Sequence, residues 1–451
     1  MTRTQLSYLY YGETTSLCEV CLSLVPTKVL FEDGNIFYLK RCHEHGNQKT
    51  LISTDIDYYK WCKDSVGPSY LPQVFQKEFE KGCPYDCGLC RDHEQHSCMA
   101  ILEIIDDCNM RCPTCIAGSF PGAGNGKSIE EIERMLDTIV ESEGQPDLVM
   151  VSGGEPTIHP QILEILRRVK ERPIKHFMLI TNGRLIASDK AFVSQLEQYK
   201  EQFEVYLQFD SLRANVLLDI RGEDLRDTRK RAIENLESAG IATTLVCVVK
   251  NGLNDDELGE IIDFALQFKC IRGVTLQPVK ASGRNETLKN THYITLSETR
   301  TRILEQFPRL RPIDMRPHPC NPENISIGYL IRRADGVVPI TELLFEESVQ
   351  SNEDGSLFFD NTAALKSMMY FLPQLNTSSV KYDDLFRVTI VSFLDQFNFS
   401  VDAARRSCIH FVTPEKQIIP LDTYYLLYAQ RLSQPIQLSP TVKLSDLRPQ
   451  Q

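Results

Sequence analysis

The 451-residue sequence is short of positive charge and of long apolar runs. It has 49 Lys and Arg residues against 61 Asp and Glu residues, which gives a net charge of -12. A protein that holds nucleic acid or an anionic membrane over a broad surface needs the opposite balance. No segment approaches the roughly 18 apolar residues of a membrane helix, and Met1 to Ser16 lacks the apolar core of a secretory signal. We therefore expect a cytoplasmic protein with no transmembrane segment and no nucleic-acid partner.

Cysteine, by contrast, is abundant and unevenly placed. Eleven of the 15 cysteines come before residue 116. Disulfides rarely persist in a reducing compartment, so the spacing of these cysteines is better interpreted as metal-ligand spacing.

The first cysteine group is Cys18-x2-Cys21 followed, after a hairpin-like stretch, by Cys42-x2-His45. Two such pairs on two turns are typical of a zinc ribbon or a rubredoxin-like site. Four protein ligands leave no open position, so the predicted role of this zinc or mononuclear iron is structural. Free cysteines in a small core are the alternative.

The second group is Cys83, Cys87 and Cys90, followed by Cys98. Four cysteines within 16 residues, in a loop with Gly and Pro, predict an auxiliary 4Fe-4S cluster. A second zinc ion remains an alternative for this group.

The third group is Cys108-x3-Cys112-x2-Cys115, with no fourth cysteine close by. A 4Fe-4S cluster held by three thiolates has one iron with open coordination, which can bind a substrate or cosubstrate. This spacing, after the strand-like segment 99–105, resembles that of the radical S-adenosylmethionine (SAM) enzymes. The alternative is another zinc knuckle.

The resemblance implies an α/β fold with a partial (β/α)6 barrel, and the downstream sequence alternates accordingly. Parallel strands with helices outside place ligand chemistry at the carboxyl ends of the strands. We expect an N-terminal metal-binding ribbon over 1–70, a cluster loop over 71–98, the radical SAM core over 99–330 and a substrate-side α+β extension over 331–451. The expected strands are 99–105, 147–152, 176–181, 204–209, 242–249 and 272–277, and the expected helices are 128–142, 160–171, 189–201, 223–239 and 255–268.

Loops after these strands carry further features of the superfamily. Gly153-Gly154-Glu155-Pro156 resembles its Gly-Gly-Glu-Pro motif, which holds the methionine end of SAM, with glycines that let the backbone approach the ligand. The resemblance also implies that Asp210 and Ser211 lie near the ribose or the carboxylate. It implies that Arg221 and Gln277 contact the carboxylate and the adenine. Ordinary loop turns and surface salt bridges remain the alternative for these four residues.

Nearly the whole chain resembles one branch of the superfamily, the tetraether lipid synthases, which were earlier described as dihydropterin methyltransferases. The resemblance rests on the order of the ribbon, the cysteine loop with His93, His96 and Cys98, the cysteine triad, and Cys408-Ile-His410-Phe411. It implies a structural mononuclear metal, an auxiliary cluster and a SAM-binding cluster. This chain departs from the pattern because no second thiol follows Cys320. Cys320 then either binds iron with Cys408 and His410, serves as a substrate-side thiol, or is an unliganded core residue.

The activity implied by the resemblance is oxygen-sensitive radical chemistry. A flavodoxin or ferredoxin passes an electron to the Cys108, Cys112 and Cys115 cluster, SAM is cleaved to a 5′-deoxyadenosyl radical, and the radical takes hydrogen from an unactivated carbon. The outcome is C–C bond formation or methylation on a lipid chain or a pterin-like substrate. Apolar segments at 357–359, 368–372 and 424–428 would suit a lipid groove, or else ordinary core. Two alternative hypotheses remain. In the first, the substrate is a peptide or another small molecule, and in the second, the protein is a non-catalytic zinc-bearing scaffold.

Overall fold

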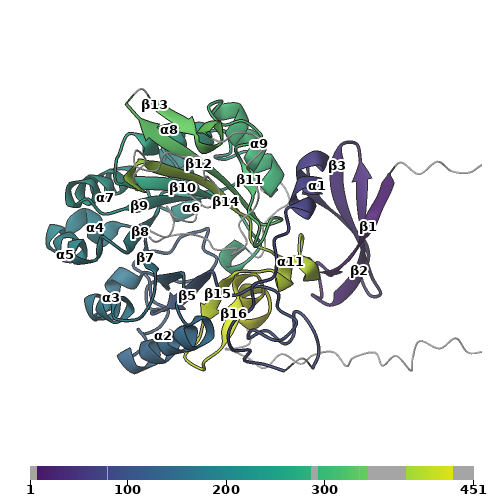
Figure 1. Ribbon diagram of the computed structural model, residues 1–451, viewed down its shortest axis with the longest axis horizontal. Helices are drawn as coiled ribbons and strands as arrows, with labels where there is room; N and C mark the ends of the chain where they lie inside the picture. The colour runs from purple at the N-terminus through teal and green to yellow at the C-terminus, as the bar shows by residue number, and fades with distance from the viewer. Residues whose placement is uncertain (1–7, 79, 286–292, 335, 344–381, 430–451) are drawn as a thin grey trace, which may run out of the picture.

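The computed structural model describes residues 8–78, 80–285, 293–334, 336–343 and 382–429. Two sheets organise these residues, and Figure 1 shows the smaller one standing to one side of the larger. The segments predicted to suit a lipid groove at 357–359 and 368–372 lie outside the described residues.

The smaller sheet is the N-terminal ribbon, with four antiparallel strands in the order β1-β2-β3-β4. Asp33 and Gly34 both have positive φ between the paired residues Glu32 and Asn35, so the predicted hairpin has the two-residue turn that suits twisted strands. Tyr59 of the following helix packs on the apolar face of this sheet. The elements are β1 (Leu9–Leu17), β2 (Leu24–Glu32), β3 (Asn35–Cys42), β4 (Gly46–Ser53) and α1 (Ile56–Asp64).

The larger sheet contains all six predicted barrel strands, parallel and in sequence order. Their residues are almost entirely buried, as in sheets covered by helices. The prediction of a parallel α/β core is confirmed. The strands are β5 (Met99–Glu103), β6 (Leu148–Ser152), β7 (His176–Thr181), β8 (Phe203–Gln208), β9 (Thr243–Val249) and β10 (Ile271–Pro278).

Helices follow each of the barrel strands β5 to β10, mostly where the sequence predicts them. Ser128 and Glu131 form a capping box at the start of α2, and Gly240 ends α7 in the left-handed conformation. The helices α4, α6 and α9 were not predicted, and α5 is shorter than expected. The helices are α2 (Ile129–Glu143), α3 (Ile162–Lys170), α4 (Arg184–Ser188), α5 (Lys190–Leu196), α6 (Ala214–Arg221), α7 (Arg226–Ala239), α8 (Leu258–Leu266) and α9 (Leu296–Gln306).

The C-terminal strands join the larger sheet at both of its edges. β14 (Leu385–Val391) pairs parallel with β10, and β15 (Ile409–Val412) pairs parallel with β5. Eight strands thus run parallel, in the order β14-β10-β9-β8-β7-β6-β5-β15. The remaining elements are β11 (Arg316–Pro317), β12 (Ile325–Arg333), β13 (Gly336–Pro339), α11 (Val401–Arg405), β16 (Ile418–Pro420), α12 (Leu421–Thr423) and the π-helix Tyr424–Tyr428.

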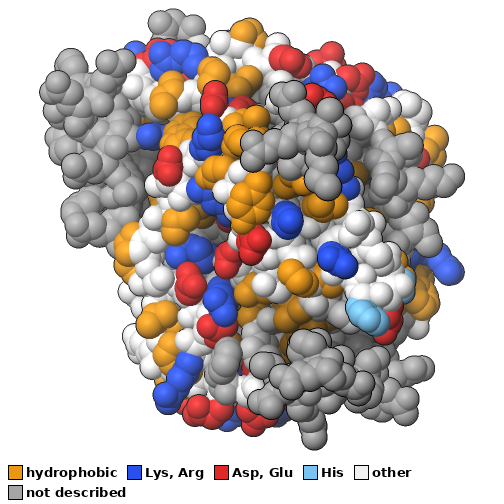
Figure 2. Space-filling view, turned by 90° about the vertical axis from the view of Figure 1, so that its right-hand side faces the viewer, with side chains coloured by type: hydrophobic (Ala, Val, Ile, Leu, Met, Phe, Trp, Pro, Cys, Tyr) orange, Lys and Arg blue, Asp and Glu red, His pale blue; other side chains and the backbone are white. Residues whose placement is uncertain are grey.

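The surface in Figure 2 mixes charges of both signs with apolar side chains. This face carries no continuous band of Lys and Arg among the residues that are described, in keeping with the overall net charge of -12. Within the described ranges, no helix is both long enough and apolar enough to cross a membrane.

Candidate active site and metal centres

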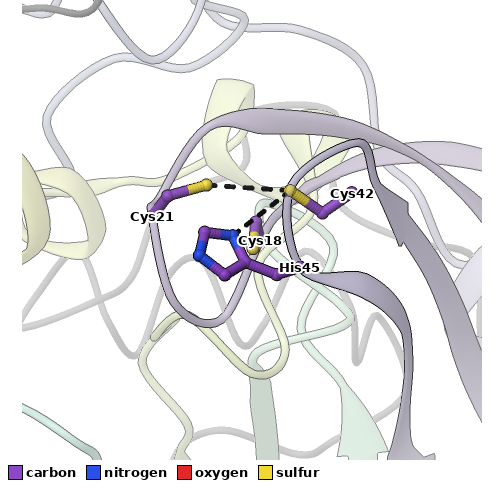
Figure 3. Close-up of side chains that lie close together, drawn as sticks. All are labelled: Cys18, Cys21, Cys42 and His45. Carbon is purple, nitrogen blue, oxygen red and sulfur yellow. Dashed lines mark hydrogen bonds between the residues drawn. The ribbon is translucent and has the colours of Figure 1, made fainter.

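The four predicted ribbon ligands lie together at one end of the small sheet (Figure 3). The donor atoms of Cys18, Cys21, Cys42 and His45 all lie within 4.8 Å of one another. The Sγ atoms of Cys21 and Cys42 are 3.8 Å apart, and His45 Nδ1 is 3.5 Å from Cys42 Sγ. Metal–sulfur bonds of about 2.3 Å in a tetrahedron separate two sulfurs by just under 4 Å. The donor set and its spacing therefore fit one tetrahedral ion.

A cavity of about 240 Å³ opens inside the larger sheet. It extends from Met99 and Ile409, at the beginning of β5 and β15, to the cysteine loop beyond the carboxyl end of β5. Eight predicted site residues line it, namely Cys108, Cys112, Cys115, Gly153, Gly154, Glu155, Arg221 and Gln277.

The two glycines dock their loop against the backbone that leads into the cysteine triad. Gly154 N–H donates to the Ile105 carbonyl at 2.8 Å, and Glu155 N–H donates to the Asp107 carbonyl at 3.0 Å. A Cβ at Gly153 would lie 2.3 Å from the Ile105 oxygen, and one at Gly154 would lie 2.1 Å from the Asp107 oxygen. Close approach between two loops, besides approach to a ligand, thus requires these glycines.

Glu155 lies at the cavity wall with its carboxylate already well supplied with donors. Thr157 donates from its amide and hydroxyl at 3.1 and 2.6 Å, Thr181 Oγ1 donates at 2.7 Å, and the Asn182 amide donates to the other oxygen at 2.7 Å. Burial raises the pKa of Glu155, while these hydrogen bonds favour its charged form. The network fixes the carboxylate in place.

Arg221 enters the cavity from the end of α6. Its guanidinium makes two hydrogen bonds to Asp210, at 2.6 and 2.7 Å, and one to Gln208 at 2.7 Å. Asp210 itself, with φ of 70°, is fully buried beneath Arg221. A bidentate pair of this kind fixes the orientation of the guanidinium.

Asp210 and Ser211, which the resemblance places near the ribose or the carboxylate of SAM, make their contacts in this structure within the protein. Neither residue is among those that line the cavity, and neither is Pro156. The Ser211 hydroxyl donates to Glu257, and the Asp210 carboxylate is taken up by Arg221 and by the Val248 amide. These contacts anchor the loop that follows β8.

The second cysteine group also differs from its prediction, since Cys98 does not join Cys83, Cys87 and Cys90. Cys98 lies with Cys320 and Cys408, with all three sulfurs within 4.8 Å of one another. The reason is strand pairing: Met99 of β5 is opposite Ile409 of β15, which brings the preceding residues Cys98 and Cys408 together. Cys83, Cys87 and Cys90 line a separate small cavity with Asp92 and His93.

The trio of Cys98, Cys320 and Cys408 is buried at the amino ends of the strands. The sulfurs of Cys320 and Cys408 are 3.3 Å apart, and His318 Nδ1 is 2.9 Å from Cys320 Sγ. His410, the predicted third donor, instead contacts His93 at 3.1 Å. This trio therefore lies at the amino ends of the barrel strands, whereas the triad of Cys108, Cys112 and Cys115 lies beyond the carboxyl end of β5.

Three charged residues of the cavity wall, Glu103, Lys280 and Arg284, were missed in the sequence. Glu103 ends β5 and accepts hydrogen bonds from Tyr425 at 3.0 Å and Tyr424 at 3.5 Å. Lys280 follows β10 and is only 4% exposed. A single Glu in the apolar run 99–105 was the available signal for the first, whereas Lys280 gave none.

Comparison with known proteins agrees with this geometry. Residues 102–265 match the radical SAM superfamily, and residues 10–54 match the HMPTM N-terminal zinc ribbon domain. The chain therefore carries a radical SAM domain over residues 102–265, preceded by a zinc ribbon domain over residues 10–54.

Among individual relatives, a 7,8-dihydro-6-hydroxymethylpterin dimethyltransferase of Methanocaldococcus jannaschii is 29% identical over 94% of this chain and 95% of its own length. A GTP 3′,8-cyclase of Heliobacterium modesticaldum is 28% identical, over 46% of this chain and 63% of its own length. A crystal structure of Streptococcus suis SuiB bound to precursor peptide SuiA covers 45% of this chain and 44% of its own, with a TM-score of 0.39 and 19% identity.

Proposed function

We propose that this radical SAM enzyme methylates a carbon atom of a dihydropterin. The observation that carries the proposal is the similarity, over 94% of the chain, to a dihydropterin dimethyltransferase. The cavity supports it because its wall combines the cysteine triad with polar groups such as the half-buried Glu103 and the buried Lys280.

The donor set suits a 4Fe-4S cluster that binds SAM. Cys108, Cys112 and Cys115 all face the cavity, so a cluster on these three thiolates keeps its fourth iron open toward the substrate. Such a cluster supplies the electron that breaks SAM into methionine and a 5′-deoxyadenosyl radical, which takes hydrogen from the substrate carbon.

The protein's own contribution is positioning and exclusion of water. Gly153, Gly154 and Glu155 hold the amino end of the SAM methionine, and Arg221 pairs with its carboxylate. Gln277, at the end of β10, contacts the adenine side. Apolar residues such as Met150 and Ile180 complete the wall and keep water from the reacting atoms.

Two further thiol groups hold auxiliary metal. We assign an auxiliary metal ion to Cys98, Cys320 and Cys408. Their sulfurs lie within 4.8 Å of one another, which is the spacing of thiolates around one metal ion. Cys83, Cys87 and Cys90 form a further iron-binding group. The ribbon binds a single zinc or iron ion. A flavodoxin or ferredoxin in the cytoplasm supplies the electron.

The test is anaerobic reconstitution with iron and sulfide, followed by incubation with SAM and dithionite. We expect 5′-deoxyadenosine, and more of it when 7,8-dihydro-6-hydroxymethylpterin is added. Expression in a host cell should add methyl groups to the pterin pool, detected by mass spectrometry, and Cys112→Ala should abolish the change. An unchanged pterin pool with altered long-chain lipids would favour a lipid substrate. A colourless zinc protein that forms no 5′-deoxyadenosine would indicate a scaffold.

A further inference from the structure

Glu103 presents unused hydrogen-bond capacity to the cavity. An ionised carboxylate accepts about four hydrogen bonds, and the hydroxyls of Tyr424 and Tyr425 supply two. Burial raises the pKa of Glu103 above its usual range. A ligand that brings additional N–H donors would therefore satisfy this group and favour its charged form.

Lys280 lines the same cavity and carries a hydrogen-bond donor, whereas Glu103 carries an acceptor. Its Nζ is buried and has no hydrogen-bond partner among the described residues. The ring of Tyr293 lies 4.9 Å away, and the charges of Asp395 and Asp422 act on Lys280 from nearby. Those carboxylates accept from backbone amides and, for Asp422, from Ser407. An ammonium donates only, so a ligand with an acceptor atom would satisfy it.

Aromatic rings line the same cavity as Glu103 and Lys280. Phe393, Phe411, Tyr206 and Tyr425 line the cavity, and the rings of Phe411 and Tyr425 lie 5.2 Å apart at a steep angle. Aromatic side chains of this kind accept a flat ring by stacking or by edge contact.

An acyl chain suits this wall poorly, because it leaves Glu103 and Lys280 without new partners on burial. A 2-amino-4-oxo heterocycle offers what both groups lack. Its ring N–H and adjacent amino group are parallel donors that a carboxylate accepts as a pair, and its oxo group and ring nitrogens accept from an ammonium.

We propose that Glu103 and Lys280 select the substrate by its ring, with Glu103 accepting from the 2-amino edge of a pterin and Lys280 donating to a ring acceptor. The inference rests on the proposed function and names the residues that give it specificity. Both residues bind substrate and not SAM, which is held at the cysteine triad by Arg221 and the Gly153–Glu155 loop.

The experiment measures binding to the SAM-loaded holoenzyme without reductant. The probes are 6-hydroxymethylpterin, which is fluorescent, and its analogue with an oxo group in place of the 2-amino group. Wild type should prefer the amino form by about 10- to 100-fold, the usual range for hydrogen bonds to a charged group. Glu103→Gln should weaken binding of the amino form by a similar factor and lose most of the preference. Lys280→Met should weaken both probes by about tenfold.

Lys250→Met is the matched control, since Lys250 is buried, pairs with Asp219 and does not line the cavity. It should bind both probes as wild type does. Every variant should also form 5′-deoxyadenosine with dithionite alone, which reports that SAM is still held correctly.

Different outcomes separate the two proposals. If wild type neither binds the amino probe nor methylates pterins, the proposed function fails. If wild type does both, yet Glu103→Gln keeps the amino preference or Lys280→Met binds normally, the inference about the residues is wrong while the function stands. Loss of substrate-free 5′-deoxyadenosine in Lys280→Met would assign that lysine to SAM instead.

Discussion

Cysteine thiols form a closed group of metal donors in the ribbon and an open group in the barrel. In the ribbon, three thiols and one imidazole surround a point at the end of an antiparallel sheet, and together they would fill every position of a tetrahedral ion. In the barrel, Cys108, Cys112 and Cys115 are three donors on a loop that faces a cavity of about 240 Å³. The chemistry therefore depends on the number of donors and on what the remaining position faces.

The largest loss of 5′-deoxyadenosine formation should come from a substitution in the triad of Cys108, Cys112 and Cys115. Cys112→Ala removes one of the three proposed cluster ligands and should abolish 5′-deoxyadenosine formation with dithionite, measured by chromatography. Cys62→Ala is the control, because Cys62 is a buried thiol in the core that belongs to none of the four thiol groups described above. Retained formation in Cys112→Ala would refute the assignment of the triad.

A nearly equal loss of 5′-deoxyadenosine formation is expected when Gly154 is replaced. A Cβ there meets the Asp107 oxygen at 2.1 Å, so Gly154→Ala must push the loop away from the cysteine triad. Displacement of a positioning loop should lower the rate of 5′-deoxyadenosine formation at least about 100-fold. Gly12→Ala, where nothing lies within 4 Å, should leave that rate unchanged. Equal rates in the two variants would show that the close approach is unimportant.

Features that depend on residues close together in the chain could be predicted from the sequence. Ligands close together in the chain, such as Cys18 and Cys21 or Cys112 and Cys115, are recognisable from spacing because a turn fixes their geometry. The barrel strands are recognisable because each is an apolar run followed by a helix. Both kinds of feature are local, and both were predicted.

The Cys98 site depends on pairing between residues more than 300 positions apart. Cys98 precedes β5 and Cys408 precedes β15, and these strands become neighbours only because the C-terminal strand adds to the edge of the sheet. Spacing alone grouped Cys98 with Cys90, its nearer neighbour in the chain. The cavity lysine Lys280 was missed for a similar reason, since its burial follows from the packing of distant segments.

In the ribbon, removal of a metal-binding cysteine should lower the stability of the protein and leave 5′-deoxyadenosine formation in place. Cys42→Ser should remove about one metal ion per chain, because a structural ion with three remaining donors is held weakly. The apparent Tm should fall by about 5 °C, while 5′-deoxyadenosine formation continues. Metal analysis and thermal melting measure these changes. A complete loss of activity with the barrel clusters intact would mean that the ribbon ion takes part in electron transfer.

The smallest expected effect concerns the carboxyl group of Glu103 in the cavity wall. Burial raises the pKa of Glu103 in the folded chain, so Glu103 binds its proton more tightly folded than unfolded. Its contribution to stability is therefore complete below the unfolded pKa of about 4.3 and is lost as pH rises through the higher folded pKa. Relative to Glu103→Gln, which cannot ionise, wild type should lose about 1–2 °C of apparent Tm across that window and nothing further at higher pH. A bound 2-amino heterocycle should shrink this difference, because its donors favour the charged carboxylate. A Tm difference that is constant with pH, or that grows when the pterin is added, would mean that Glu103 does not face the ligand as an acceptor.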